Sequence, residues 1–190
     1  MGAVFPPSDV ERFATRSSSG KHRATTMSTS HRIIVRDADP RDTADIVDFN
    51  RRLALESEEK LLDPEVVTAG VRRGFSHPEL CRYLVAEIDG RVVGTTMITV
   101  ELTDWRDGVL WWLQSVYVAP EFRGAGVFRA LYRHIAERAH ANKDVRGLRL
   151  YVHHTNQRAM RVYEAMGMAK ADYEFYEHDW SDAVRRRVED

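Results

Sequence analysis

The sequence predicts an α/β fold in which a mixed central sheet carries helices on both faces. Residues 109–118 (VLWWLQSVYV) are apolar on both sides of an extended chain, which is typical of a central strand covered on both faces. A turn with two glycines follows and leads into residues 127–141, where apolar residues recur every four positions, as in an amphipathic helix. A further strand after this helix predicts a right-handed crossover to a parallel neighbour.

The first part of the predicted domain contributes one strand and two helices. Residues 31–36 (HRIIVR) form a short β-branched run, and a helix is predicted for 40–56 with Asp39 as its cap. A second helix begins at Pro64, a position where proline's missing N–H costs nothing. Carboxylates gather around these helices, either as a solvated acidic face or as an acidic lip that attracts a cationic amine. They are Glu56, Glu58, Glu59, Asp63 and Glu65.

A β-hairpin is predicted for residues 82–88 and 91–102. Asp89 and Gly90 connect its arms, and this pair suits a type I′ turn because both central residues need positive φ. The second arm alternates between apolar and polar residues, which places Glu101 on the face opposite its apolar side chains.

The last elements are a strand at 148–153, a short helix that opens at Asn156, and an aromatic-rich extended segment at 168–178. Gly167 stands where a helix C-cap glycine belongs, and 168–178 is predicted to supply the last strand or pair of strands. The complete predicted order is β-α-α-β-β-β-α-β-α-β.

The 190 residues predict one folded domain with a loose segment at either end. Hydrophobic residues make up 43% of the chain, enough for a core over residues 31–180. Residues 1–30 are rich in Ser, Thr, Ala and Arg without apolar periodicity, so we expect a disordered leader or an over-extended start with Met27 as the alternative. Residues 181–190 are expected to form a solvated tail.

Composition excludes several functional classes. A net charge of -1 provides no electrostatic footprint for nucleic acid, and no apolar run is long enough to span a membrane. The single cysteine, Cys81, excludes an internal disulfide and a zinc site of several thiolates, and no metal site is predicted. We therefore expect a cytoplasmic protein with Cys81 as a half-buried structural thiol.

The turn at residues 123–126 (RGAG) predicts an anion site. A helix that starts directly after glycines presents unpaired backbone N–H groups and the positive end of its dipole to a phosphate. The turn is not a Rossmann fingerprint, because Arg129 stands where the third glycine is needed, and no Gly-Lys-Ser/Thr follows as in a P-loop.

A second constellation lies on the helix that opens at Asn156. Residues 156, 159, 163 and 167 are spaced so that they lie along one side of a helix. Small Ala159 leaves room for a slender ligand, and Tyr163 projects a hydroxyl beside that room. A buried core tyrosine is the alternative interpretation of Tyr163 when it is taken alone.

Together these residues resemble two motifs of the GNAT superfamily of N-acetyltransferases, and the likeness covers residues 32–178. The pyrophosphate-binding pattern V-x-P-x-x-R-G-x-G is met from Val118 to Gly126, and N-x-x-A-x-x-x-Y-x-x-x-G is met from Asn156 to Gly167. The order of the predicted elements also matches the family. Phe128 is a departure, since the family often has Gly or Ala there.

The resemblance implies a GNAT-like fold with acetyl-CoA, or another acyl-CoA, as co-substrate. Backbone N–H groups of residues 123–127 would hold the pyrophosphate, and the pantetheine arm would lie along residues 116–118, where two strands of the family's sheet splay apart. The helix that opens at Asn156 would form the far wall. The implied cofactor-binding residues are Val116, Tyr117, Val118, Arg123, Gly124, Ala125, Gly126, Val127, Phe128, Asn156, Ala159 and Tyr163.

The implied reaction is direct attack of a neutral amine on the thioester, with two catalytic positions. The backbone N–H of Val116 would polarise the thioester carbonyl, and Tyr163, a phenol of pKa ~10, would protonate the leaving thiolate. The general base stays unassigned, because Trp112 stands where some relatives carry a Glu. Candidates for the base are Glu101, Glu56, Glu58, Glu59, His153 and His154.

The acceptor is expected to be a small cationic amine. The alternatives are a protein N-terminus or lysine as acceptor and, in another functional class, a sensor that binds acyl-CoA without catalysis. A homodimer is a further expectation, with the aromatic residues Tyr173, Phe175, Tyr176 and Trp180 as its interface.

Overall fold

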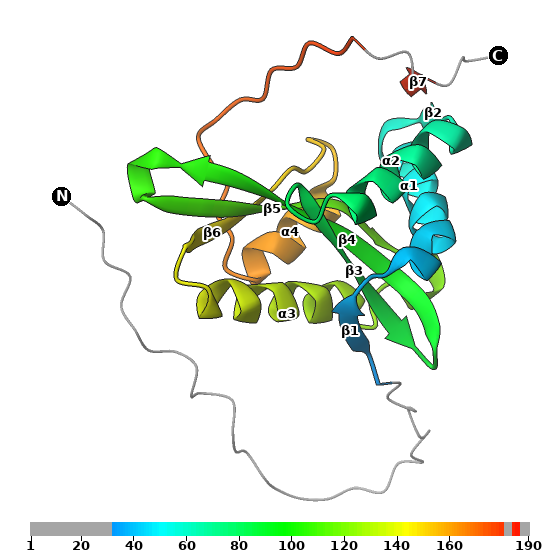
Figure 1. Cartoon of the computed structure of the whole chain (residues 1–190), viewed down its shortest axis with the longest axis horizontal. Helices are drawn as coiled ribbons and strands as arrows, with labels where there is room; N and C mark the ends of the chain where they lie inside the picture. Colours follow the sequence, from blue (N-terminus) through cyan, green and yellow to red (C-terminus); the bar gives the residue numbers. More distant parts are fainter. Residues whose placement is uncertain (1–31, 181–183, 187–190) are drawn as a thin grey trace, which may run out of the picture. The chain divides into compact units, whose positions relative to one another are not determined.

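A five-stranded sheet forms the centre of the computed structural model, which describes residues 32–180 and 184–186 (Figure 1). The predicted leader and most of the predicted tail lie outside these described residues. The strand order is β1-β3-β4-β5-β6, antiparallel except for the parallel pair β5–β6. The strands are β1 (Ile34–Asp37), β3 (Cys81–Ile88), β4 (Arg91–Thr103), β5 (Gly108–Val118) and β6 (Val145–Leu150).

The predicted hairpin is confirmed as β3 and β4. Asp89 and Gly90, which join the two strands, have φ angles of 50° and 76°. Positive φ at both central residues is what a type I′ connection requires, and Gly adopts it without a Cβ clash.

In the described part of the chain, four helices accompany the sheet: α1 (Thr43–Glu58), α2 (Pro64–Ser76), α3 (Val127–Ala141) and α4 (Gln157–Ala165). Short 3₁₀ turns precede α1 and flank β5: Pro40–Asp42, Asp104–Arg106 and Pro120–Phe122. Side-chain caps fix two helix starts, since Asp63 Oδ1 accepts from Glu65 N at 2.8 Å and Asn156 Oδ1 accepts from Ala159 N at 3.0 Å.

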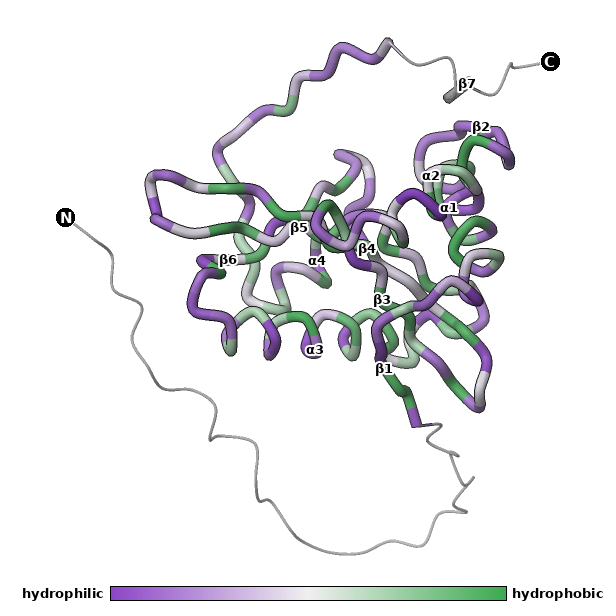
Figure 2. The backbone as a smooth tube through the Cα atoms, in the orientation of Figure 1, coloured by the Kyte–Doolittle hydropathy of each residue, from purple (hydrophilic) through white to green (hydrophobic). Residues whose placement is uncertain are grey.

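Alternation along β3 divides the core into two layers. Leu84, Ala86 and Ile88 pack with α3, whereas Tyr83 and Val85 pack with residues of α1 and α2. In Figure 2 the tube of α3 alternates between hydrophobic and hydrophilic residues, and its buried side chains are those of the predicted four-residue repeat. Helices therefore cover both faces, as predicted. The buried repeat of α3 is Val127, Leu131, Ile135 and Ala139.

Three strand predictions need correction. The strand predicted at 31–36 begins three residues later, as Ile34–Asp37. The strand predicted at 148–153 begins and ends three residues earlier, as Val145–Leu150, because its ladder with β5 starts at Val109 opposite Val145. The strand predicted at 168–178 is wrong: these residues form no strand, and their aromatic side chains are exposed because no sheet edge pairs with them. A second, two-stranded sheet instead joins β2 (Lys60–Leu62) to β7 (Val184–Arg186) within the predicted tail.

An ion-pair cluster fixes β1 to the start of α1, and we predict that it makes stability fall in acid. Arg36 Nη1 donates to Asp42 Oδ2 at 2.7 Å, and Arg36 Nη2 donates to Glu87 Oε1 at 2.5 Å. The hydrogen bond from Arg36 holds the pKa of buried Asp42 below its ordinary value of 3.8. Because the folded pKa is the lower one, this stabilisation is complete above about pH 4 and is lost as pH falls through the folded pKa.

The variant Asp42→Asn tests this cluster. We expect a loss of roughly 1.5–3 kcal/mol in the free energy of unfolding at pH 7, since a charged hydrogen bond is removed from a buried site. Urea titrations at pH 7 and pH 3 should show a smaller pH dependence in the variant than in the parent. Asp48→Asn is the matched control, because the exposed pair Arg52–Asp48 contributes only about 0.5 kcal/mol. An unchanged pH dependence in Asp42→Asn would contradict the assignment.

Candidate active site

The glycine turn after β5 has the geometry of an anion site. Gly124 and Gly126 have φ angles of 87° and 88°, and Gly126 caps α3 without any side-chain hydrogen bond. A Cβ built at either glycine meets no atom within 4 Å, so open space lies in front of the backbone. The first N–H groups of α3 have no partner inside the helix and are available to an anion.

Arg123 braces this turn through its side chain. Its Nε donates to Val118 O at 2.9 Å, and its Nη2 donates to Glu56 Oε2 at 2.6 Å. Tyr117 Oη donates to Glu56 Oε1 at 2.6 Å, and the guanidinium lies 5.3 Å from the centre of the Tyr117 ring. Arg123 thus ties the turn to β5 and α1, which leaves anion contact to backbone N–H groups.

These contacts also change the interpretation of Glu56. Burial alone would raise the pKa of this carboxyl, but the hydrogen bonds from Tyr117 and Arg123 outweigh burial, and the pKa lies below its ordinary value. Burial and the hydrogen bond to Glu56 raise the pKa of Tyr117 to about 12. A carboxylate with both oxygens occupied and a lowered pKa is a poor proton acceptor, so Glu56 is a structural brace.

A β-bulge interrupts β5 beside the turn, and the sequence did not predict it. Thr95 pairs with Tyr117 and Met97 with Gln114, so two residues, Ser115 and Val116, lie opposite the single residue Thr96. Ser115 has φ +50°, which is uncommon for a residue other than Gly, Asn or Asp. No glycine or asparagine marks this position, so the sequence carries no signal for it.

The other edge of β5 is open over the same stretch. β6 ends at Leu150, which pairs with Leu113, so residues 114–118 have no parallel neighbour. This is the splaying expected beside Val116 and Val118. An unpaired strand edge presents N–H and C=O groups to any ligand that carries amides.

Phe128 brings the two sequence motifs together. Its ring meets that of Tyr163 edge-on at 5.4 Å, which places α4 beside the first turn of α3. Burial raises the pKa of Tyr163, so its hydroxyl keeps its proton at neutral pH. Within residues 32–180 no group hydrogen-bonds this hydroxyl, which leaves it available as a donor. Asn156 caps α4 through Oδ1, and Ala159 is half-buried at its start.

The remaining base candidates differ in their surroundings. Glu101 accepts from the Trp112 indole and pairs with Arg149 at 3.2 Å, and Glu58 pairs with Lys60 at 2.6 Å. His153 and His154 are exposed, and their tilted rings have centres 4.5 Å apart. Glu59 is exposed at the end of α1, with φ +55°. Among these candidates only Glu58 lines the cavity described next.

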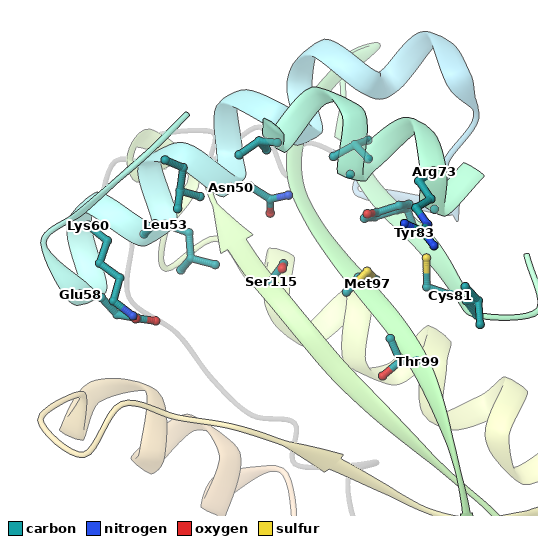
Figure 3. A pocket seen from close by; sticks show the side chains of 17 residues that line it. Asn50, Leu53, Glu58, Lys60, Arg73, Cys81, Tyr83, Met97, Thr99 and Ser115 are labelled. Carbon is teal, nitrogen blue, oxygen red and sulfur yellow. The ribbon is translucent and has the colours of Figure 1, made fainter. Parts of the chain in front are cut away.

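A cavity of about 610 Å³ lies on the face of the sheet covered by α1 and α2 (Figure 3). It reaches Ser115 of the bulge, so it meets β5 at the point where the ladder is interrupted. Gly74 lets α2 approach β3, because a Cβ there would lie 2.7 Å from the Tyr83 ring and 2.9 Å from Cys81 Sγ. Cys81 is half-buried, as predicted, and burial raises the pKa of its thiol.

Most residues that line this cavity were not predicted as site residues from the sequence. Asn50 of α1 and Arg73 of α2 line it, and their only sequence signal is a place on predicted helices. Within the described residues, no group of three or more His, Cys, Asp or Glu side chains could hold a metal ion. None of the described helices combines the length and the apolar character needed to cross a membrane.

Comparison with known proteins places these features in a family context. The model of the acetyltransferase (GNAT) family matches residues 46–168. A thialysine N-epsilon-acetyltransferase of Bos taurus is 32% identical over 145 residues, which cover 71% of this chain and 83% of that protein.

Solved structures share the fold. The crystal structure of a possible acetyltransferase from Clostridium difficile 630 has a TM-score of 0.72 and 37% identity, covering 77% of this chain and 97% of its own. A predicted acetyltransferase from Clostridium acetobutylicum, crystallised with acetyl-CoA, has a TM-score of 0.63 at 18% identity, covering 78% of this chain and 96% of its own.

Proposed function

The chain belongs to the GNAT acetyltransferase family and is an acyltransferase, and from this premise we propose that it moves an acetyl group from acetyl-CoA to a small primary amine. The observation that carries the proposal is the bulge at Ser115 and Val116. The edge of this interrupted strand has no parallel neighbour, and Ser115 of the bulge lines the cavity under α1 and α2. A thioester laid along the open edge and an amine in the cavity could meet there.

The proposed cofactor site runs along β5 and into α3. The pantetheine arm lies against Val116, Tyr117 and Val118, whose edge lacks a parallel neighbour. The pyrophosphate lies at the turn, held by backbone N–H groups. Asn156, Ala159 and Tyr163 form the far wall. The residues proposed to surround the pyrophosphate at the turn are Arg123, Gly124, Ala125, Gly126, Val127 and Phe128.

The proposed chemistry is direct transfer. Acetyl-CoA supplies an acyl group activated as a thioester. The neutral amine attacks the carbonyl carbon, a C–N bond forms, and the C–S bond breaks with its electron pair on sulfur. The Val116 N–H stabilises the developing oxyanion, and Tyr163 donates its proton to the thiolate. The proton that the amine loses passes to water or to Glu58, the one base candidate on the cavity wall.

A small acceptor is favoured by the cavity itself. About 610 Å³ under two helices accommodates a compact molecule better than a folded protein surface, and a relative is named for the small amine thialysine. Transfer to a protein N-terminus or lysine, and acyl-CoA binding without catalysis, are the other outcomes of the test below.

Release of free CoA thiol tests the proposal directly. Purified full-length protein is incubated with acetyl-CoA and a panel of small amines, amino acids and peptides, and acetyl-CoA affinity is measured in parallel by calorimetry. We expect micromolar to millimolar binding and thiol release that depends on a small amine. Turnover on peptides alone would reassign the acceptor, and tight binding without any turnover would favour a sensor.

A further inference from the structure

Inside the cavity, Asn50 carries a buried hydrogen-bond acceptor without a partner. Its Oδ1 is shielded from solvent and makes no hydrogen bond to any group of the described chain. Buried polar side-chain atoms are usually paired, and Asn50 is one of the residues that line the cavity, so rotation of its amide would offer this orphaned oxygen to a donor there. Figure 3 shows Asn50 reaching from α1 toward the space beside Ser115, where β5 is interrupted. An amine supplies the N–H donor that this oxygen lacks.

Of the three charged side chains that line the cavity, two form an ion pair with each other. Glu58 and Lys60 form an ion pair with 2.6 Å between Oε2 and Nζ, so their charges offset each other. Arg73 is the remaining charged residue of the lining, and it makes neither a hydrogen bond nor an ion pair with the described residues. The cavity therefore has an excess positive charge at Arg73, beside Gly74, Cys81 and Tyr83.

This distribution does not suit an acceptor that carries positive charge alone. A polyamine needs free carboxylates, but Glu56 is occupied by Tyr117 and Arg123, and Glu58 is occupied by Lys60. Asp63 accepts two backbone N–H groups at the start of α2. Three of the five carboxylates of the predicted acidic lip therefore have structural partners.

We propose that the acceptor is a small amine that also carries a carboxylate, with its amine at Asn50 and its carboxylate at Arg73. The guanidinium provides donors in a planar fork that fits a carboxylate, and Asn50 Oδ1 accepts from the amine. Figure 3 shows Asn50 and Ser115 in the middle of the cavity and Arg73 at one end, beside Tyr83 and Cys81. The inference rests on the proposed function, because it names the acceptor of that same reaction.

Matched pairs of amines test the carboxylate. L-lysine is compared with 1,5-diaminopentane, and L-leucine with 3-methylbutylamine, so that each pair differs only in the carboxylate. We expect kcat/KM, measured by CoA thiol release, to favour the carboxylate member of at least one pair by about tenfold or more. Absence of a preference for the carboxylate member in both pairs would overturn the inference.

Variants assign the two anchors. Arg73→Gln should raise KM for the preferred carboxylate substrate about tenfold. The ratio of kcat/KM between the two amines of the pair should then be close to one. Arg72→Gln is the matched control, because Arg72 is the preceding arginine of α2 and does not line the cavity. Asn50→Leu should lower kcat/KM for both members of the pair about tenfold, since both present an amine. Equal effects of Arg73→Gln on both members would refute a carboxylate anchor.

The same data separate this inference from the proposed function. Calorimetry with acetyl-CoA and thermal unfolding establish that each variant folds and binds its co-substrate. If acetyl-CoA binds but no amine is acetylated, the proposed function fails. If carboxylate-free amines are the better substrates, transfer to small amines stands and only the assignment of Arg73 and of the acceptor class fails.

Discussion

Replacement of Tyr163 by phenylalanine is expected to lower kcat by about a hundredfold or more, with the Kd for acetyl-CoA changed by less than about twofold. The variant keeps the ring that packs edge-on against Phe128 at 5.4 Å and removes only the hydroxyl. Burial raises the pKa of this phenol, so the parent side chain is protonated throughout the neutral range. Without that proton the thiolate must leave as an anion, which slows the breakdown of the tetrahedral species.

Tyr132→Phe is the control for this variant. Tyr132 lies on α3 and is half-buried, and the centre of its ring is 6.2 Å from that of Phe128. Burial raises the pKa of its phenol as well. Loss of this hydroxyl should leave kcat within about twofold, since the residue has no place in the proposed site. Equal turnover in Tyr163→Phe and the parent would remove Tyr163 from the mechanism.

Gly126→Ala is expected to weaken acetyl-CoA binding about tenfold and to cost about 1–2 kcal/mol in the free energy of unfolding. The stability loss follows from φ +88°, which an L-residue adopts only with strain. The affinity loss follows from the open space at this glycine, because the new methyl group would project to where the pyrophosphate approaches the first turn of α3.

Gly90→Ala separates these two effects. Gly90 has φ +76°, also with nothing within 4 Å of an added Cβ, but it lies in the hairpin between β3 and β4. Its alanine variant should lose similar stability in chemical denaturation and keep the parent Kd in calorimetry. If both variants lost affinity equally, the loss would come from general destabilisation and the proposed pyrophosphate site would be refuted.

Much of the fold could be predicted because its signals are local. The helix Val127–Ala141 agrees with its predicted bounds, since a four-residue apolar repeat follows directly on glycines with positive φ. The hairpin turn at Asp89 and Gly90 could also be predicted from these two residues alone. The two motifs were linked in the sequence only through a family resemblance. In the structure, the contact between Phe128 and Tyr163 brings them together.

The parts that could not be predicted depend on partners distant in sequence. The segment 168–178 has the aromatic content of a strand, but a strand also needs a neighbouring edge, and no such edge accompanies it in the structure. Pairing of β2 with β7 joins residues more than a hundred positions apart. The excess charge at Arg73 emerges only once Lys60 is seen to pair with Glu58.

The bulge at Ser115 can be understood as a one-residue insertion that leaves the core unchanged. Leu113, Val116 and Val118 all pack on the α3 side of the sheet, although three positions separate the first two. A strand without Ser115 would place the same three side chains on the same face, because regular alternation then restores the period of two. The extra residue therefore changes the backbone hydrogen bonds of β5 and not its hydrophobic packing. A chain of this fold can gain or lose the interruption by insertion or deletion of a single codon, without a compensating change in any buried side chain.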